Sequence, residues 1–459
     1  MSTKSCRPVA ILGGVRTPFC RSNTSYQDLT NLDLMGAALG GLVANYKLAN
    51  KHIGEVVGGS VVTHSKDWNI AREAVIGTRL SPTTPGITMM QACGTSLQAL
   101  MGSAAKISIG QIESAIGVGS DTVSDAPVVF KRRFAQRLVK LGKARSFKEK
   151  LAIFKGFSVG ELAPQPPSTS EPRTGLSMGG HCELMAQFWH IPRADQDELA
   201  YESHQNAIKA YEDGFHDDLI VPCAGVFRDN NIRDDITLEK LSSLRTSFEK
   251  SSRGSLTAAN STPLTDGASS VLISSEDWAK QNGHQVQALL VDAETSAIDF
   301  VKGEGLLMAP TVAVARLLER QNMKLQDFDY YEIHEAFAAQ VLSTLKAWES
   351  EDYCKETLGL DAPLGSIDRS KLNVKGSSLA YGHPFAATGA RIVAHLAKLI
   401  SQNPGSNGLI SICTAGGMGV AAILKSPEEA KPEVKSDVDQ ITQPEDTEAE
   451  TNSETLDES

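Results

Sequence analysis

Lys375-Gly-Ser-Ser-Leu-Ala-Tyr-Gly-His383-Pro-Phe-Ala-Ala-Thr-Gly-Ala-Arg391 is the stretch from which the fold and the chemistry of this sequence can be read. It places one histidine on a tight Gly-His-Pro turn and follows it at once with a helix predicted over 386–400. Unpaired N–H groups at a helix N-terminus favour negative charge, so this position suits an anion or a developing oxyanion. A histidine beside a turn can equally be structural, and the rest of the chain has to decide.

The size and composition of the chain indicate a soluble, glycine-rich α/β enzyme. Its 459 residues, 41% of them hydrophobic and 38 of them glycine, suffice for two or three domain-sized units with a large core. No apolar run reaches the roughly 18 residues that a membrane span needs, and no signal peptide is expected. The seven scattered cysteines lack a Cys-x-x-Cys pair, which argues against disulfides or a zinc cluster and for a cytoplasmic location.

The negative charge of the chain is concentrated at its end. Residues 426–459 contain 12 acidic residues against two lysines and so carry −10 of the formal net charge of −11. The segment has almost no large apolar side chains, and we expect an acidic disordered tail.

Two regions of the chain alternate strand-like and helix-like patterns. In the first, the pattern predicts strands at 9–12, 55–62, 88–92 and 114–118 and helices at 33–48, 69–78 and 96–109. A strand at 268–274 resumes this series, and a second series covers about 286–425. Such alternation predicts a mostly parallel sheet with covering helices.

The two series resemble each other in order, which suggests an internal duplication. In each, a reactive residue (Cys93 or His383) precedes a helix, a strand and a glycine-containing segment. The intervening part contains helices near 179–190 and 195–213 and the loop-like 163–170. We therefore predict an N-terminal half at 1–126 plus 256–280, an inserted loop domain at 127–255, a C-terminal half at 281–425 and the tail at 426–459.

Two cysteines and a second histidine are candidates for chemistry. Cys93 lies at a strand-to-helix junction, where a sharp turn exposes a nucleophile and the helix N-terminus stabilises a thiolate, although a buried apolar cysteine is the alternative. Cys413 ends a strand and enters a glycine-rich turn that could offer N–H donors. His334 precedes a predicted helix, which it could cap, or it could orient a water; Glu335 is expected in the first turn of that helix.

Several blocks of the sequence resemble the thiolase family. They are Gly-His-Pro-x-x-Ala-Thr-Gly at 382–389, His-Glu-Ala-Phe at 334–337 and Cys-x-x-Gly-Gly-x-Gly at 413–419. Cys93 matches the acyl-accepting cysteine of that family, and 257–268 resembles the segment that borders its coenzyme A pocket. The resemblance covers about 8–425 in the family's order. His334 (where most members have Asn) and the basic segment 131–155 look most like the thiolase (beta) subunits of bacterial fatty-acid oxidation complexes and of the mitochondrial trifunctional enzyme.

This resemblance implies a fold and an activity. The expected fold is the thiolase fold, with two similar βαβαβαββ halves in five αβαβα layers and an inserted loop domain. The expected activity is that of a 3-ketoacyl-CoA thiolase, an acetyl-CoA C-acyltransferase of fatty-acid β-oxidation. The alternatives are an acetyl-CoA acetyltransferase working mainly in synthesis, a condensing ketosynthase, which lacks the second cysteine, and a scaffold or lipid carrier without activity.

The resemblance also implies a role for each site residue. His383 would activate Cys93 as the nucleophile, Cys413 would be the acid and base, and His334 would position a water or oxyanion. Coenzyme A contacts are expected at Met178, Thr262 and Ala415; the last replaces a glycine of many thiolases and needs only its N–H. Coenzyme A would be a co-substrate, with no metal and no nicotinamide cofactor.

A basic amphipathic helix is predicted at 131–155, where ten Lys and Arg residues face a single Glu149. It could be a solvated face packed on the body, a docking surface for a partner subunit or a peripheral membrane contact. The branch resemblance implies an alpha subunit with hydratase and dehydrogenase activities, and the family implies a homodimer or larger assembly. Nucleic acid is not expected, because no nucleic-acid motif accompanies the charge.

Overall fold

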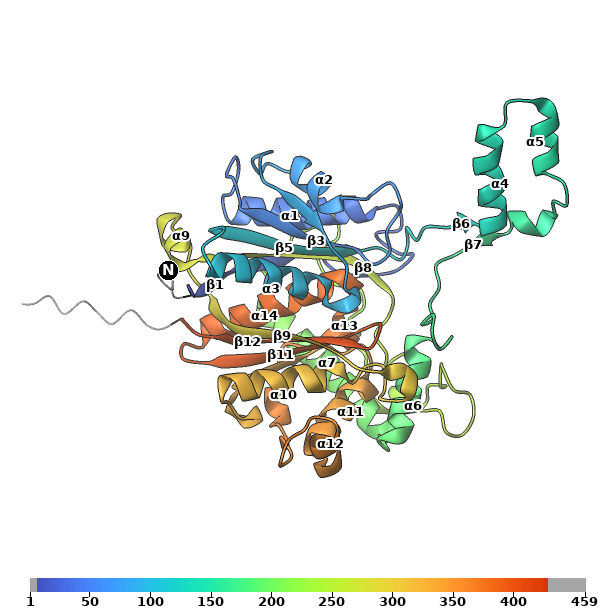
Figure 1. Ribbon diagram of the computed structural model, residues 1–459. Coiled ribbons are helices and arrows are strands. Elements are labelled where there is room, and N and C mark those ends of the chain that lie inside the picture. Colours follow the sequence, from blue (N-terminus) through green and yellow to red (C-terminus); the bar gives the residue numbers. More distant parts are fainter. Residues whose placement is uncertain (1–5, 428–459) are drawn as a thin grey trace, which may run out of the picture. The chain divides into compact units, whose positions relative to one another are not determined.

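The computed structural model describes residues 6–427 (Figure 1). Nearly all of the predicted acidic tail, 426–459, lies outside the described residues. Among the described residues, no helix is long and apolar enough to cross a membrane. All seven cysteines are free thiols.

The N-terminal half builds a five-stranded sheet in the order β1-β8-β5-β3-β4. Its strands are β1 (Val9–Arg16), β3 (Glu55–Gly59), β4 (Gly86–Thr88), β5 (Ser114–Asp121) and β8 (Thr265–Ser275). β1 and β5 both pair antiparallel with β8, whereas β3 pairs parallel with β5 and with β4. All residues of β1, β5 and β8 are buried, as expected of strands covered on both faces.

The C-terminal half repeats this pattern. Its strands are β9 (Ala288–Ala297), β10 (Tyr330–Ile333), β11 (Asn407–Thr414) and β12 (Met418–Lys425), in the order β9-β12-β11-β10. β12 pairs antiparallel with β9 and β11, β10 pairs parallel with β11, and a parallel bridge joins Tyr331 to Leu372 where the first half has β4. The same sequence of pairings in both halves supports the predicted duplication. An antiparallel pairing of β1 with β9 joins the two sheets.

Five layers are visible in Figure 1. Helices α1 (Asn31–Asn45) and α2 (Ile70–Ile76) cover the outer face of the first sheet, and α10 (Ala309–Gln321) and α11 (Ala338–Glu349) cover the outer face of the second. Between the sheets lie α3 (Thr95–Ser108) and α14 (Thr388–Gln402), whose apolar side chains form one core cluster. The fold prediction is confirmed, and the two helices that follow Cys93 and His383 share the central layer.

The expectation of a mostly parallel sheet is wrong. β8 and β12 run antiparallel to both of their neighbours, so each half is a mixed sheet. The alternation of strand and helix patterns in the sequence predicts parallel pairing only for strands that are connected through a helix. β11 instead reaches β12 through the short turn at 415–417, and such a turn can join only antiparallel strands.

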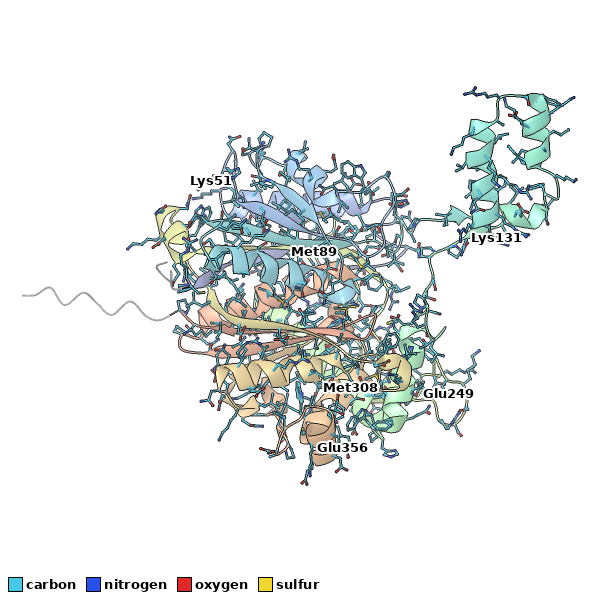
Figure 2. The ribbon with its side chains drawn as sticks, in the orientation of Figure 1. Lys51, Met89, Lys131, Glu249, Met308 and Glu356 are labelled. Carbon is cyan, nitrogen blue, oxygen red and sulfur yellow. The ribbon has the colours of Figure 1, made fainter. Side chains whose placement is uncertain are left out.

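The inserted part contains β6 (Val129–Phe130), α4 (Arg132–Lys143), α5 (Phe147–Ile153), β7 (Pro164–Gln165), α6 (Met178–Phe188), α7 (Arg193–Glu212) and α8 (Leu238–Ser242). The basic segment therefore forms two helices and not one; Lys131 marks its start in Figure 2. Ser146 and Glu149 form a capping box, which begins α5 after the extended Ala144 has ended α4. Shorter elements complete the chain: β2 (Cys20–Arg21), α9 (Glu276–Gln281), α12 (Glu351–Glu356) and α13 (Ser378–Tyr381), with 3-10 turns at 92–94, 159–162, 300–302, 325–327, 369–371 and 385–387.

Candidate active site

Cys93 lies in a 3-10 turn, 92–94, directly before α3. Its neighbour Ala92 has a φ of 44°, a left-handed conformation that residues with a side chain adopt only at a cost. This sharp turn leaves Cys93 partly accessible at the end of the central helix. The predicted strand at 88–92 is wrong except for its first residue: β4 runs from Gly86 to Thr88, and the chain leaves the sheet before the cysteine.

His383 is held on the turn that precedes α14. Gly382 has a φ of 98°, and a Cβ there would lie 2.3 Å from the side chain of Thr265. The close approach lets the His383 N–H donate to the Thr265 hydroxyl at 2.6 Å. This hydrogen bond fixes the backbone of His383 to β8 of the N-terminal half, the half that also contains Cys93.

Cys93 and His383 form a hydrogen-bonded pair. The Cys93 Sγ lies 3.0 Å from His383 Nε2, and His383 Nδ1 lies 2.6 Å from the Thr388 hydroxyl. When Nδ1–H donates to Thr388, Nε2 presents its lone pair to the thiol. Burial lowers the pKa of His383 to about 3, with a further contribution from Arg391, and burial raises the pKa of Cys93 to about 12. The resting pair is therefore a neutral thiol and a neutral imidazole.

His334 stands beside this pair. The centroids of the His334 and His383 rings are 4.2 Å apart, and His334 is fully buried. Its Nδ1 contacts the Ser378 hydroxyl at 3.0 Å, whereas its Nε2 is buried without a protein partner. Burial, then the nearby His383 and Arg391, hold its pKa well below the usual range. His334 does not cap a helix, because α11 begins only at Ala338.

A buried polar cluster supports His334 from behind. Arg391 Nη2 donates to the Ser378 hydroxyl at 2.9 Å and to the Ser377 hydroxyl at 3.2 Å. The expectation for Glu335 is wrong: it precedes α11, and its carboxylate accepts hydrogen bonds from Ser203, Asn373 and the Leu379 N–H. These contacts tie the segment after β10 to the segment around α13.

Cys413 is buried near the end of β11 and belongs to a core cluster that also includes apolar residues of α6. Its pKa is raised well above the usual range, first by burial and then by the neighbouring Cys93 and Cys182. Two backbone N–H groups lower the pKa of Cys93: that of Ala415, in the turn after Cys413, and that of Cys93 itself. Both N–H groups therefore lie close enough to the Cys93 sulfur to favour its thiolate form.

The turn after Cys413 is contacted by Glu171, which lies in a loop of the inserted part. The Gly416 N–H donates to the Glu171 carboxylate at 2.8 Å. Gly416 and Gly417 have φ values of 82° and 69°, and a Cβ on Gly417 would collide with Phe300. The turn thus needs glycines at both positions, whereas Ala415 keeps an ordinary conformation.

Asp121 supports the His383 turn from the end of β5. Its carboxylate accepts from the N–H groups of Val61, Val62 and Ala386 at 2.8–2.9 Å. Burial raises its pKa to about 7, against the effect of these bonds. Asp121 thereby positions the backbone that carries His383 into α14.

Two of the three expected coenzyme A residues, Thr262 and Ala415, lie next to groups of this site. The Thr262 hydroxyl donates to the backbone carbonyl of Ser378 at 2.7 Å. The side-chain hydroxyl of the same Ser378 contacts His334. Met178 begins α6 and packs against the core cluster that contains Cys413. Ala415 lies in the turn beside Cys93. The structure thus brings Cys93, His334, His383, Cys413 and Ala415 together, and places Thr262 behind them.

Sequence reasoning missed the groups that hold the reactive side chains. They are Thr388, Ser378, Arg391, Asp121 and Glu171. Three of these stand inside the stretch 375–391, so the density of polar residues there was an available signal. Asp121 is the last residue of a buried strand, and functional side chains gather at the ends of such strands. Glu171 offered no signal, because its partner is a backbone group 245 residues away.

Comparison with known proteins gives a consistent result. A family model described as "Thiolase, N-terminal domain" matches residues 9–277, and one described as "Thiolase, C-terminal domain" matches 285–426. The chain is 41% identical over 423 residues to "3-ketoacyl-CoA thiolase" of Shewanella baltica, which covers 91% of this chain and 96% of that protein. A similar protein of Shewanella loihica matches equally.

Solved structures agree with the sequence comparison. Bacillus anthracis acetyl-CoA acetyltransferase aligns with a TM-score of 0.76 and 28% identity, over 93% of this chain and 100% of the other. Human mitochondrial 3-ketoacyl-CoA thiolase in complex with CoA aligns with a TM-score of 0.75 and 26% identity, over 92% and 98%.

Proposed function

This chain belongs to the thiolase family of acyltransferases, and from that premise we propose that it cleaves 3-ketoacyl-CoA with coenzyme A. The products are acetyl-CoA and an acyl-CoA shortened by two carbons, as in fatty-acid β-oxidation. The single observation that carries the proposal is the contact of Cys93 with His383 beside a second buried cysteine, Cys413. A condensing ketosynthase needs the first pair but not the second cysteine.

The first step uses the Cys93–His383 pair. His383 is neutral and free at Nε2, so it takes the thiol proton as the thiolate attacks the keto carbon of the substrate. The N–H groups of Cys93 and Ala415 stabilise the tetrahedral oxyanion. Thr388 keeps the imidazole in the tautomer that this step requires.

The second step breaks the carbon–carbon bond and leaves an acyl thioester on Cys93. The electron pair stays with the departing acetyl-CoA as an enolate, which needs one proton. Cys413 is held in its thiol form by burial and supplies that proton. His383, and a water or N–H at His334 Nε2, stabilise the enolate oxygen. Ser378 can donate to Nδ1 of His334 while it accepts from Arg391, which leaves Nε2–H for this task.

The last step releases the shortened acyl group. A coenzyme A thiol loses its proton to Cys413, now the base, and attacks the thioester carbonyl on Cys93. The shortened acyl-CoA leaves, and the released Cys93 thiolate regains the proton that His383 removed in the first step. Met178 and Thr262 are proposed to line the coenzyme A pocket. Coenzyme A is a substrate in this scheme, and the protein side chains supply every proton transfer without a further cofactor.

A thiolysis assay tests the proposal. Loss of 3-ketoacyl-CoA should depend on added coenzyme A, and radiolabelled substrate should leave label on wild-type protein but not on Cys93→Ala. Label retained by Cys93→Ala would refute the nucleophile. Cys413→Ala should turn over at least about a hundredfold more slowly, the usual loss of a general acid, and label should collect on Cys93 only slowly because the enolate has lost its proton donor. Near-normal turnover in both directions would remove Cys413 from the mechanism.

The acyl chain is proposed to lie in an apolar cavity of about 470 Å³ between α6, the 300–305 segment and α12. The cavity shares Phe300 with the turn after Cys413, because Phe300 packs against Gly417. A cavity of this size supports degradation of longer chains over synthesis of acetoacetyl-CoA, which needs no such space. A substrate series from short to long chains separates the two: activity restricted to acetoacetyl-CoA would favour the synthetic acetyltransferase.

A partner subunit is proposed to dock on α4 and α5. Phe147 (80% exposed), Leu151 and Val139 are exposed on these basic helices. The side-chain hydrogen bonds of 131–161 all end within that segment. Exposed apolar groups among cations fit an acidic, partly apolar surface, such as that of a hydratase/dehydrogenase subunit. Replacing 131–161 by a short Gly-Ser linker should abolish co-purification of that subunit and keep thiolysis of short substrates. Loss of vesicle binding instead would assign the helices to a membrane surface.

The protein is also proposed to form a homodimer through the edge strand β4, in the cytoplasm. β4 ends the sheet with one edge unpaired, and Ile87 and Met90 beside it are exposed. An isologous pairing of two such edges would cover both. Light scattering at micromolar concentration should give twice the chain mass, and a monomer would contradict the dimer.

A further inference from the structure

Three potential metal ligands meet at the candidate active site. One ligand atom each from Cys93, His334 and His383 lies within 4.8 Å of the others. The residues are far apart in the sequence, so no metal-binding spacing is visible there. The fold alone brings a thiol and two imidazoles into one buried place at the N-terminal end of the central helices.

Both imidazoles are oriented as metal ligands usually are. His383 uses Nδ1 for Thr388 at 2.6 Å, and His334 uses Nδ1 for Ser378 at 3.0 Å. In protein metal sites, the ring nitrogen that does not bind the ion is held by such a second contact, which fixes the tautomer. Nε2 of His383 already lies 3.0 Å from the Cys93 sulfur. With an ion bound at Nε2 of His334, its Nδ1–H would donate to Ser378, the tautomer opposite to the one that serves the enolate oxygen. Nε2 of His334 is fully buried and has no protein partner.

The donor set selects the class of ion. One thiolate and two neutral imidazoles suit a borderline-soft divalent ion such as Zn²⁺ and do not suit Mg²⁺ or Ca²⁺, which prefer oxygen. We propose that Cys93, His334 and His383 form an inhibitory Zn²⁺ site, in which the ion closes the active site reversibly. A fourth, open position remains for a water or for the thiol of coenzyme A. The ion is a competitor of the substrate and takes no part in the acyl transfer.

The chemistry of binding is balanced by one proton. Cys93 loses its thiol proton as the sulfur bonds to the ion, and the proton goes to solvent because Nε2 of His383 is also occupied by the ion. The nucleophile and its base are then both blocked. Arg391, buried behind Ser378, opposes a further positive charge there, so we expect the ion to be removable by a chelator.

Cobalt is the probe for the test, since Co²⁺ replaces Zn²⁺ in such sites and absorbs visible light. Metal-free full-length protein titrated with Co²⁺ should bind one equivalent per chain. The spectrum should show a thiolate-to-cobalt charge-transfer band and the visible bands of a tetrahedral ion. Zn²⁺ should bleach both. One proton should be released per ion in weakly buffered solution.

Variants identify the ligands. Cys93→Ala should abolish the charge-transfer band, and His334→Asn should weaken binding at least about tenfold, the loss that even a change behind a ligand produces. Cys223→Ser, which removes a half-buried thiol elsewhere, and Cys413→Ala should both leave the spectrum and affinity unchanged. An unchanged spectrum in Cys93→Ala or His334→Asn would overturn the proposal, and so would its loss in Cys413→Ala.

Enzyme kinetics connect the site with regulation, separately from the proposed function. Zn²⁺ should inhibit thiolysis competitively with the 3-ketoacyl-CoA substrate, and a chelator should restore the rate. Protection of Cys93 from alkylation by Zn²⁺ tests the same site without turnover. A protein that binds Co²⁺ as described but lacks thiolysis would refute the function alone. A protein that is active but binds no Co²⁺ at Cys93 would refute the metal site alone.

Discussion

At the scale of single residues, the reactive groups depend on neighbours that do no chemistry themselves. His383 can act as a base only while its Nδ1 keeps a proton, and the Thr388 hydroxyl is the group in contact with that nitrogen. Thr388 is fully buried, so no water is available to replace it. Its hydroxyl therefore decides which ring nitrogen faces Cys93.

Thr388→Val should lower kcat/KM for thiolysis by about 10- to 100-fold, because a buried hydrogen bond of about 1–3 kcal/mol is lost at a catalytic base. The KM should change little, since Thr388 does not touch the proposed substrate pockets. Thr388→Ser keeps the hydroxyl and should recover most of the rate. The rate of alkylation of Cys93 should fall in parallel; an unchanged alkylation rate would show that Thr388 does not act through His383.

The low pKa of His383 predicts the pH dependence of activity. Because burial lowers this pKa from the usual 6.5 to about 3, the imidazole stays neutral throughout the range in which the protein works. A pH profile of kcat/KM should therefore show no acid limb near pH 6.5. If kcat/KM falls below pH 6.5 while substrate binding does not, the result would contradict a neutral resting base.

The same shift affects stability with a definite sign. Between about pH 6.5 and about pH 3 the unfolded chain takes up a proton at His383 that the folded chain refuses. The contribution of His383 to folding is present above pH 6.5 and is lost as the pH falls through that window.

At the scale of elements, an inserted loop and a strand-connecting turn share one contact. Glu171 accepts from the Gly416 N–H, and this turn carries Ala415, whose N–H reaches the Cys93 sulfur. The turn between β11 and β12 has two glycines with positive φ and little stiffness of its own. The loop therefore supplies order that the turn lacks.

Glu171→Ala should lower kcat by about tenfold and shift the thermal unfolding temperature only slightly, because a single hydrogen bond is lost but the proposed oxyanion donor becomes mobile. Glu171→Gln retains an acceptor oxygen and is the matched control, with activity near wild type. If both variants melt much earlier and lose activity in proportion, Glu171 stabilises the fold and does not order the turn.

At the scale of the whole molecule, the proposed acyl pocket lies between the insertion and the C-terminal half. The apolar cavity takes its walls from α6, which belongs to the insertion, and from the 300–305 segment and α12. Leu184 lines it and is 53% exposed, so a larger side chain there can enter the cavity without disturbing the core.

Leu184→Trp should reduce kcat/KM for long-chain 3-ketoacyl-CoA at least about tenfold and spare short chains, because it removes volume from the proposed acyl pocket. Ile109→Trp is the control, because it adds a side chain of the same size at an exposed position at the end of α3. It should leave kcat/KM unchanged for both long and short chains. Equal loss with all chain lengths would place the acyl chain elsewhere.

The sequence by itself determined the element order, the duplication and the identity of the reactive residues as candidates. Those features depend on local patterns, such as strand and helix periodicity and turns rich in glycine, and on motifs such as Gly382-His383-Pro384. The helix after His383 and the strand at 265–275 were predicted to within a few residues for that reason.

Only the tertiary structure decided how those parts are joined. The antiparallel return of β8 and β12, the division of the basic segment into two helices, and the contacts of Thr388, Ser378, Asp121 and Glu171 depend on pairing and burial between distant segments. A residue's pKa follows from the same burial, which is why His383 is a neutral base here. Local sequence patterns do not predict which distant side chains are buried next to one another. That shared burial shifts their pKa values and so determines the chemistry of this site.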